Sequence, residues 1–147
     1  MDARAQLYND IKGIIASRVE EIKHVGLWNQ DTDFLEEGTP YGLPALLIEF
    51  GDIEWGSYAK DGETRMFAVG KGNIKYHLLC EWNNETDDTT PFILSEKVNE
   101  ALVSIPSSTI YSVWYPSVTY TNHDHANIVE SGEEFMVKYW RTIPRME

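Results

Sequence analysis

The chain has 147 residues and carries 24 acidic against 12 basic side chains, a formal charge of −12. A field of that sign opposes approach to DNA, RNA or an anionic membrane surface, which argues against nucleic-acid binding through a basic face. Hydrophobic residues make up 42% and aromatic residues 12% of the chain, which is enough for one buried core and excludes a wholly disordered protein. We therefore expect a single domain over residues 1–147.

The first segment has helical periodicity from Ala3 to about Val25. Its apolar residues recur at spacings of three and four and form one stripe: Leu7, Ile11, Ile14, Ile15, Val19 and Ile22. Gly26 is a typical helix stop, and residues 28–43 then lack periodicity and are rich in Asp, Glu, Gly and Thr, which predicts an acidic connecting loop. The start resembles no signal peptide, and no apolar stretch approaches the ~20 residues of a membrane span, so we expect a cytoplasmic protein without membrane contact.

Short apolar runs in the middle of the chain predict strands. The first is Ala45–Phe50, which follows a proline and ends at a glycine. Residues 53–59 and 64–69 predict two less regular short strands around a turn at residues 60–62.

The clearest strand covers residues 73–82, where polar and apolar residues alternate. One face carries Ile74, Tyr76, Leu78, Cys80 and Trp82, and the other carries Lys75, His77 and Glu81. The single cysteine cannot form an internal disulfide, and we interpret it as a small buried hydrophobic residue.

A second helix is predicted after Thr90, an N-cap followed by Pro91 at the first helical position. Its apolar residues keep helical spacing until Pro106, which ends the helix: Leu94, Val98, Ala101, Leu102 and Ile105.

Two further strands are predicted at Tyr111–Tyr120 and Glu133–Arg141, with Pro116 marking a sheet edge or a bulge. Between them we expect an irregular crossing or a short strand at Asn127–Val129. This order predicts an α+β fold, with a mixed or antiparallel sheet of about four to six strands and two main helices packed on one face.

Sequence signatures of catalysis are absent. The chain contains no G-x-S-x-G, no G-x-G-x-x-G and no G-x-x-x-x-G-K-[ST], so we predict a non-enzymatic protein without catalytic or cofactor-binding residues. His123 and His125 would share one face of an extended strand, but no third metal ligand is indicated, and we favour a polar surface turn there. A metal-binding protein that uses these two histidines remains an alternative. His24 and His77 belong to no motif and are interpreted as surface or satisfied core residues.

The aromatic residues point to interactions with other subunits. In residues 111–115 and 133–141, large side chains alternate onto both faces, and a sheet with two apolar faces needs two covers. Helices supply one cover, and either the same chain or a neighbouring subunit supplies the other. Because tryptophan is enriched at interfaces, we predict four subunit or partner contacts: Trp28, Trp55, Trp114 and Trp140.

The order of these segments across nearly the full chain resembles the tail terminator, or tail-completion, proteins of long-tailed bacteriophages and their prophages. The resemblance rests on an opening helix and on five further segments: Pro44 followed by ALLIEF, Gly72 followed by NIKYHLLCEW, the helix PFILSEKVNEALVSI, and the two closing strands SVWYPSVTY and EEFMVKYW.

The resemblance implies a structural virion protein. Such a protein forms a homo-oligomeric ring, possibly a hexamer, on the last ring of the tail tube, ends tube polymerisation and joins the tube to the head connector. Its partners would be itself, the tail tube protein and the head–tail connector, and its location the bacterial cytoplasm during assembly and then the virion tail. No catalytic residues or cofactors come with the family. The alternative from another class is a small acidic interaction module, of inhibitor or immunity type, that engages a basic partner.

Overall fold

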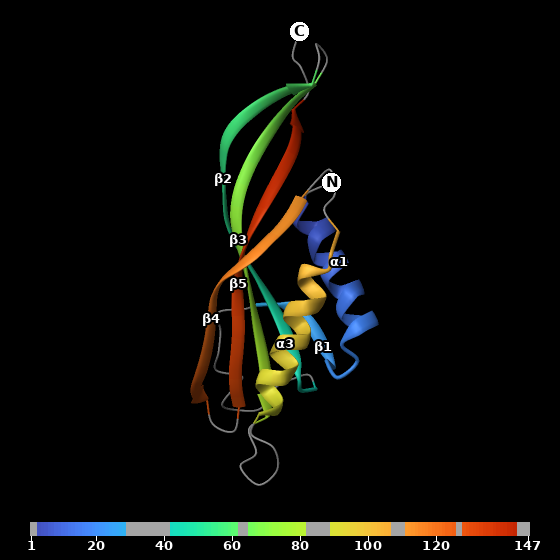
Figure 1. Ribbon diagram of the computed structural model, residues 1–147, viewed down its shortest axis with the longest axis vertical. Coiled ribbons are helices and arrows are strands. Elements are labelled where there is room, and N and C mark those ends of the chain that lie inside the picture. The colour runs from blue at the N-terminus through green and yellow to red at the C-terminus, as the bar shows by residue number, and fades with distance from the viewer. Residues whose placement is uncertain are drawn as a thin grey trace.

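The computed structural model describes residues 3–28, 42–61, 65–81, 89–106, 111–125 and 128–143. Side chains are described in these ranges except at 57–61, 65–67, 113–115, 123–125 and 142–143. Helices and strands follow one another as α1 (Ala3–Arg18), β1 (His24–Leu27), β2 (Ala45–Asp61), β3 (Arg65–Glu81), α3 (Thr90–Val103), β4 (Tyr111–His125) and β5 (Ile128–Ile143). Figure 1 shows both helices on the same side of a long, curled sheet.

The sheet has five strands in the order β1-β2-β3-β5-β4. Strand β1 runs parallel to β2, and the other neighbours are antiparallel, so the sheet is mixed. This confirms the predicted α+β fold, its mixed sheet and the packing of the two helices on one face. We call the side that α1 and α3 cover the helical face and the opposite side the far face.

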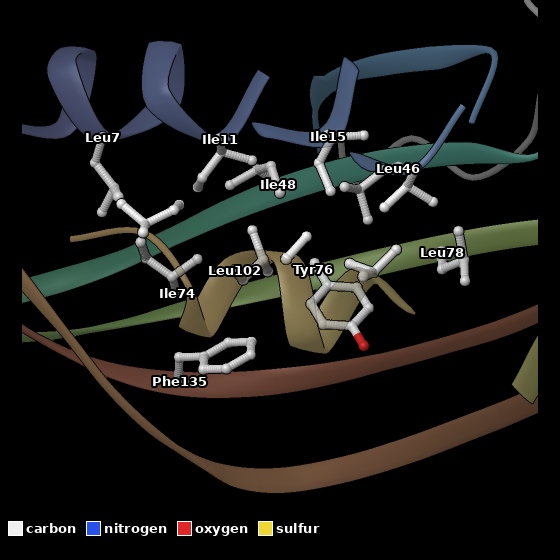
Figure 2. Packing of buried hydrophobic residues seen from close by; sticks show 14 of the residues in the cluster. Leu7, Ile11, Ile15, Leu46, Ile48, Ile74, Tyr76, Leu78, Leu102 and Phe135 are labelled. Carbon is white, nitrogen blue, oxygen red and sulfur yellow. The ribbon is translucent and has the colours of Figure 1, made fainter. Parts of the chain in front are cut away.

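The main core lies between the helices and the helical face (Figure 2). Helix α1 contributes Leu7, Ile11 and Ile15 to it, as the spacing of its apolar residues predicts, and Cys80 is buried there too. Each fully buried leucine or isoleucine contributes about 1.5–3 kcal/mol. The Tyr76 hydroxyl lies 2.8 Å from Ser95 Oγ, so the polar end of a core side chain is hydrogen bonded to α3.

The predicted end of the first helix is wrong, because α1 ends at Arg18 rather than near Val25. His24–Leu27 instead forms β1, whose residues pair with residues 45–48 of β2. The Trp28 backbone N–H donates to the Ile48 carbonyl at 2.8 Å. Hydrogen bonds to a distant strand therefore replace those of further helical turns. The predicted loop at 28–43 lies mostly outside the described residues.

The middle strands are longer than predicted. The short strands expected at 45–50 and 53–59 form one strand, β2, and those at 64–69 and 73–82 form β3. Gly70 does not interrupt β3, because the space above it holds side chains of β2: a Cβ there would lie 2.7 Å from Ile53 Cγ2 and 2.8 Å from Trp55 Cε3. Gly70 and Gly72 allow side chains of the neighbouring strands to pack on the β3 backbone.

The last part of the chain differs from prediction at element ends. Thr89, not Thr90, occupies the N-cap of α3, and its side chain makes no capping hydrogen bond. The predicted irregular crossing is wrong over the described residues, since β4 continues to His125 and β5 begins at Ile128. The prediction that Pro116 marks a sheet edge or a bulge is confirmed. β4 is an edge strand of the sheet, and its pairing register with β5 shifts on either side of the proline.

Three strands continue past the helices. Strand β4 begins at Tyr111, opposite Tyr139, while β5 continues to Ile143 beside β3 and β2. We call residues 55–61, 65–70 and 139–143 the arm, which projects beyond α1 in Figure 1. Within the described ranges, no helix has the length and apolar character needed to cross a membrane.

Candidate functional site

Part of the far face is covered by the chain itself. Leu47, Leu79 and Ile128 form a second buried cluster, and Trp28 and Leu43 pack against it. The sequence left open whether the chain or a neighbouring subunit covers this face. Around this cluster, the chain supplies the cover.

A buried polar cluster adjoins these residues and is centred on His77 of β3. The His77 ring lies between two carboxylates: Nδ1 is 2.9 Å from Glu130 Oε2, and Nε2 is 3.0 Å from Glu49 Oε1. His77 is 4% exposed and Glu130 is 5% exposed, whereas the Glu49 side chain is 37% exposed. Buried charged groups are expensive unless they are paired, so these contacts hold the centre of the far face together.

Two aromatic side chains enclose the histidine. Trp28 stacks on the His77 ring, with ring centroids 3.7 Å apart and an interplanar angle of 6°. The Tyr120 hydroxyl lies 2.8 Å from His77 Nδ1 and donates to Glu130 Oε2, also at 2.8 Å. Burial, reinforced by the hydrogen bond to Glu130, raises the pKa of Tyr120.

Gly132 of β5 makes room for Tyr120. A Cβ at this position would lie 2.0 Å from the Tyr76 carbonyl oxygen and 2.5 Å from Tyr120 Cε1. The tyrosine ring therefore lies on the glycine backbone, and its hydroxyl reaches across to β3, where its oxygen lies 3.3 Å from the Tyr76 carbonyl oxygen. Any larger residue would push the ring away from His77.

The proton content of the cluster follows from its geometry. A neutral imidazole donates from only one nitrogen, and an ionised carboxylate only accepts. The contacts of His77 with Glu130 and with Glu49 can both be hydrogen bonds only if one more proton is present than in a neutral imidazole beside two carboxylates. That proton is on the ring or on one of the two glutamates. His77 and Glu130 are buried and contact each other, while Glu49 lies at the solvent-exposed side of the cluster, so these contacts join residues of β2, β3 and β5.

The same geometry argues against a metal site at His77. The two glutamates contact opposite nitrogens of one ring, so the three groups do not converge on a common point. Among the residues with described positions, no group of three or more His, Cys, Asp or Glu side chains is arranged to hold a metal ion. His123 and His125 lie on β4, but their side chains are outside the described set, so the metal alternative there stays a prediction.

The tryptophans predicted at interfaces lie in different settings. Trp28 contacts His77 within the chain and is part of the far-face cover. Trp55 and Trp140 belong to the arm: the Arg141 guanidinium lies 4.6 Å from the Trp55 ring centroid, and the Lys138 ammonium lies 5.3 Å from that of Trp140. The Trp114 side chain is outside the described set. The structure thus brings Trp55 and Trp140 to one end of the molecule.

A shallow hollow of about 440 Å³ lies between α1 and the segment after α3. Its polar groups include Asp10, which accepts a hydrogen bond from the Tyr111 hydroxyl. Burial, followed by this contact with Asp10, raises the pKa of Tyr111. A protonated tyrosine that is already bound to the carboxylate offers no free acid or base to a ligand.

No sequence motif indicates the His77 cluster. Glu49, Tyr120 and Glu130 lie 28, 43 and 53 residues from His77, so no local motif joins them. The alternating pattern predicted the face that His77 occupies and left open whether it is a surface or a satisfied core residue, and the structure shows that it is buried. A scan against protein-family models finds no match, and a search of curated proteins finds no significant similarity.

Proposed function

We propose that this chain is a non-enzymatic assembly protein of the tail-terminator kind, which forms a ring with copies of itself at the end of a phage tail tube. The observation that supports the proposal is the arm, in which three long strands extend past the helical layer. Tyr139 of the arm is buried in the main core and Trp55 packs against it, while Arg141 is exposed and provides surface for neighbours.

The side chains of the arm fit this use. Trp55 with Arg141 and Trp140 with Lys138 place an aromatic ring and a cation on each face of the arm. Tryptophan and arginine are enriched among the few interface residues that contribute most of the binding free energy. In a ring, one patch of each copy meets a different patch of the next, so a protein with two unlike surfaces is suited to it.

The acidity supports the same role. A charge of −12 on every copy lets DNA pass through the centre of a ring without adhering to its wall. In this proposal the ring ends polymerisation of the tube and binds the head connector, and the protein is found in the host cytoplasm and then in the virion tail. No catalytic step is involved.

The first test is the mass of the purified protein by light scattering over a concentration series, with negative-stain imaging of any large species. We expect annular particles with a mass that is an integral multiple of the chain, either alone or on addition of purified tail tubes. A chain that stays monomeric in both conditions contradicts the proposal.

The second candidate is an acidic interaction module, and the observation that favours it is the outer surface of α3. Phe92, Ile93 and Val103 are exposed there, at 44%, 54% and 48%, beside the exposed Glu96 and Glu100. Such a surface suits a basic partner protein. A strict monomer that binds one basic protein at equimolar ratio through this surface would support this reading instead.

A further inference from the structure

Trp28 covers two neighbouring groups of side chains on the far face. Its backbone N–H donates to the Ile48 carbonyl at 2.8 Å, and its side chain packs against the buried apolar cluster of this face. The same side chain lies flat on the His77 ring, with ring centroids 3.7 Å apart. His77 is the register partner of Leu47, a member of the apolar cluster, so the polar and apolar groups lie side by side under one tryptophan. The position of Trp28 therefore depends on the state of the His77 ring.

The contacts of the His77 ring favour the form in which the ring itself carries the added proton. Imidazole is a stronger base than a carboxylate, so the proton goes to the ring in preference to a glutamate. At Nδ1, Glu130 Oε2 already accepts from the Tyr120 hydroxyl and so faces the ring as an acceptor. At Nε2 the ring faces Glu49 Oε1, and a positive ring stacked on the indole of Trp28 gains a favourable cation–π contact. Together these contacts favour an imidazolium with both nitrogens protonated.

Other titratable groups face the cluster from each neighbouring element. On β4, burial raises the pKa of Tyr120 and the hydrogen bond to Glu130 raises it further, so this hydroxyl keeps its proton where a histidine titrates. On β3, the Lys75 ammonium lies 4.3 Å from the Tyr120 ring centroid. Three more groups lie on the far face of β5, β3 and β1: Glu134, Glu81 and His24. The carboxylates within hydrogen-bond distance of the His77 nitrogens are those of Glu49 and Glu130.

Glu49 connects the buried ring to solvent, because its side chain is 37% exposed. A base in solution removes the Nε2 proton by way of Glu49 Oε1, which lies 3.0 Å away, and leaves a neutral ring that still donates from Nδ1 to Glu130. The Nε2 lone pair then faces a carboxylate, and two acceptors at this distance repel each other. The contact with Glu49 is lost, and so is the charge that favours the stacking with Trp28.

We propose that His77 is a pH-sensitive switch, whose proton holds Trp28 over the apolar cluster of the far face and whose deprotonation releases it. The release uncovers Leu47 and Leu79, which belong to that cluster. The covered form binds one proton more than the uncovered form, so it is favoured at low pH and loses this advantage as pH rises through the titration of the ring. The inference rests on contacts within one chain and holds whether or not the chain forms the proposed ring.

Nitrogen-15 NMR measures the charge of the ring. The chain contains four histidines, so the triple variant His24→Gln/His123→Gln/His125→Gln leaves His77 as its one imidazole without a change in the cluster. We expect both ring nitrogens to be protonated at pH 6 and the Nε2 proton to be lost between pH 6 and pH 10. A ring that is neutral at pH 6 would place the added proton on a glutamate and overturn the proposal. A ring that keeps both protons up to pH 10 would overturn it as well.

Fluorine-19 NMR of protein labelled with 5-fluorotryptophan measures the position of Trp28. The signal that is missing from Trp28→Phe assigns the resonance, and its shift between H₂O and D₂O reports exposure to solvent. We expect Trp28 to become exposed over the same pH range in which the His77 ring loses its Nε2 proton. A Trp28 resonance that stays buried while the ring becomes neutral would overturn the switch.

Glu49→Gln separates the switch from a general effect of pH. The glutamine amide donates to Nε2 of a neutral ring, so this contact no longer needs the added proton. We expect the ring of this variant to lose its proton at a lower pH than in the wild type, because one facing negative charge is gone, and Trp28 to stay buried throughout. Glu54→Gln, on the same strand and face, and Glu133→Gln, on the helical face, are the controls and should behave as the wild type does. Release of Trp28 in Glu49→Gln at the wild-type pH would overturn the proposal, and urea unfolding at pH 7 checks that every variant folds.

Discussion

Replacement of His77 by leucine tests the polar cluster of the far face. The substitution removes both ring nitrogens that face Glu130 and Glu49, while leucine retains much of the buried volume. Glu130 is only 5% exposed, so it stays buried without the imidazole that faces it, although the Tyr120 hydroxyl still donates to it. Breaking a buried ion pair from one side costs about 3–5 kcal/mol, and loss of the stacking with Trp28 adds about 0.5–1.5 kcal/mol.

The assay is urea unfolding followed by circular dichroism, with thermal unfolding in parallel. For a chain of this size, 1 kcal/mol shifts the melting temperature by about 2–4 °C, so the pair alone predicts a decrease of roughly 6–20 °C. The double variant His77→Leu/Glu130→Leu should recover much of this loss, because a buried pair replaced by apolar residues is often neutral in stability. His24→Leu, a less buried histidine on the far face, is the matched control and should cost less.

The reasoning would be refuted by either of two results. A cost below about 1 kcal/mol for His77→Leu would show that Glu130 finds water or another partner without penalty. Equal instability of the single and the double variant would show that lost packing, rather than an uncompensated charge, dominates the effect.

Three further predictions concern other buried groups. Burial raises the pKa of Glu133, so the folded state favours the protonated form of this side chain. The folded state therefore loses stability as pH rises through that pKa. Glu133→Gln should raise the urea midpoint at pH 7 more than at pH 4. Burial raises the pKa of Cys80 to about 11, so iodoacetamide at pH 8 should label the thiol only as fast as the protein unfolds, and labelling of native protein within minutes would contradict this. Gly132→Ala should destabilise by about 1–3 kcal/mol in urea unfolding, because the new Cβ meets the Tyr76 carbonyl and displaces Tyr120 from the cluster, and a neutral effect would show that the strand shifts freely.

The sequence determined those features that depend on local periodicity. A helix or a strand repeats its buried side every 3.6 or two residues, so the stripe from Leu7 to Ile15 and the alternation after Gly72 predicted both the element and its core face. The fold class followed from the order of these elements. The predicted tryptophan contacts and the ring remain hypotheses, because a pattern of exposed aromatic residues does not name its partner.

Only the tertiary structure decided where elements end and which polar groups meet. Residues 24–27 leave the helical pattern because β2 offers them backbone hydrogen bonds, and β3 continues through Gly70 because Trp55 of another strand fills the space above it. His77 is buried because Glu130 and Glu49, from two neighbouring strands, meet its two nitrogens. These are pairings between residues tens of positions apart, and their energies depend on strand register, which no local stretch of sequence contains.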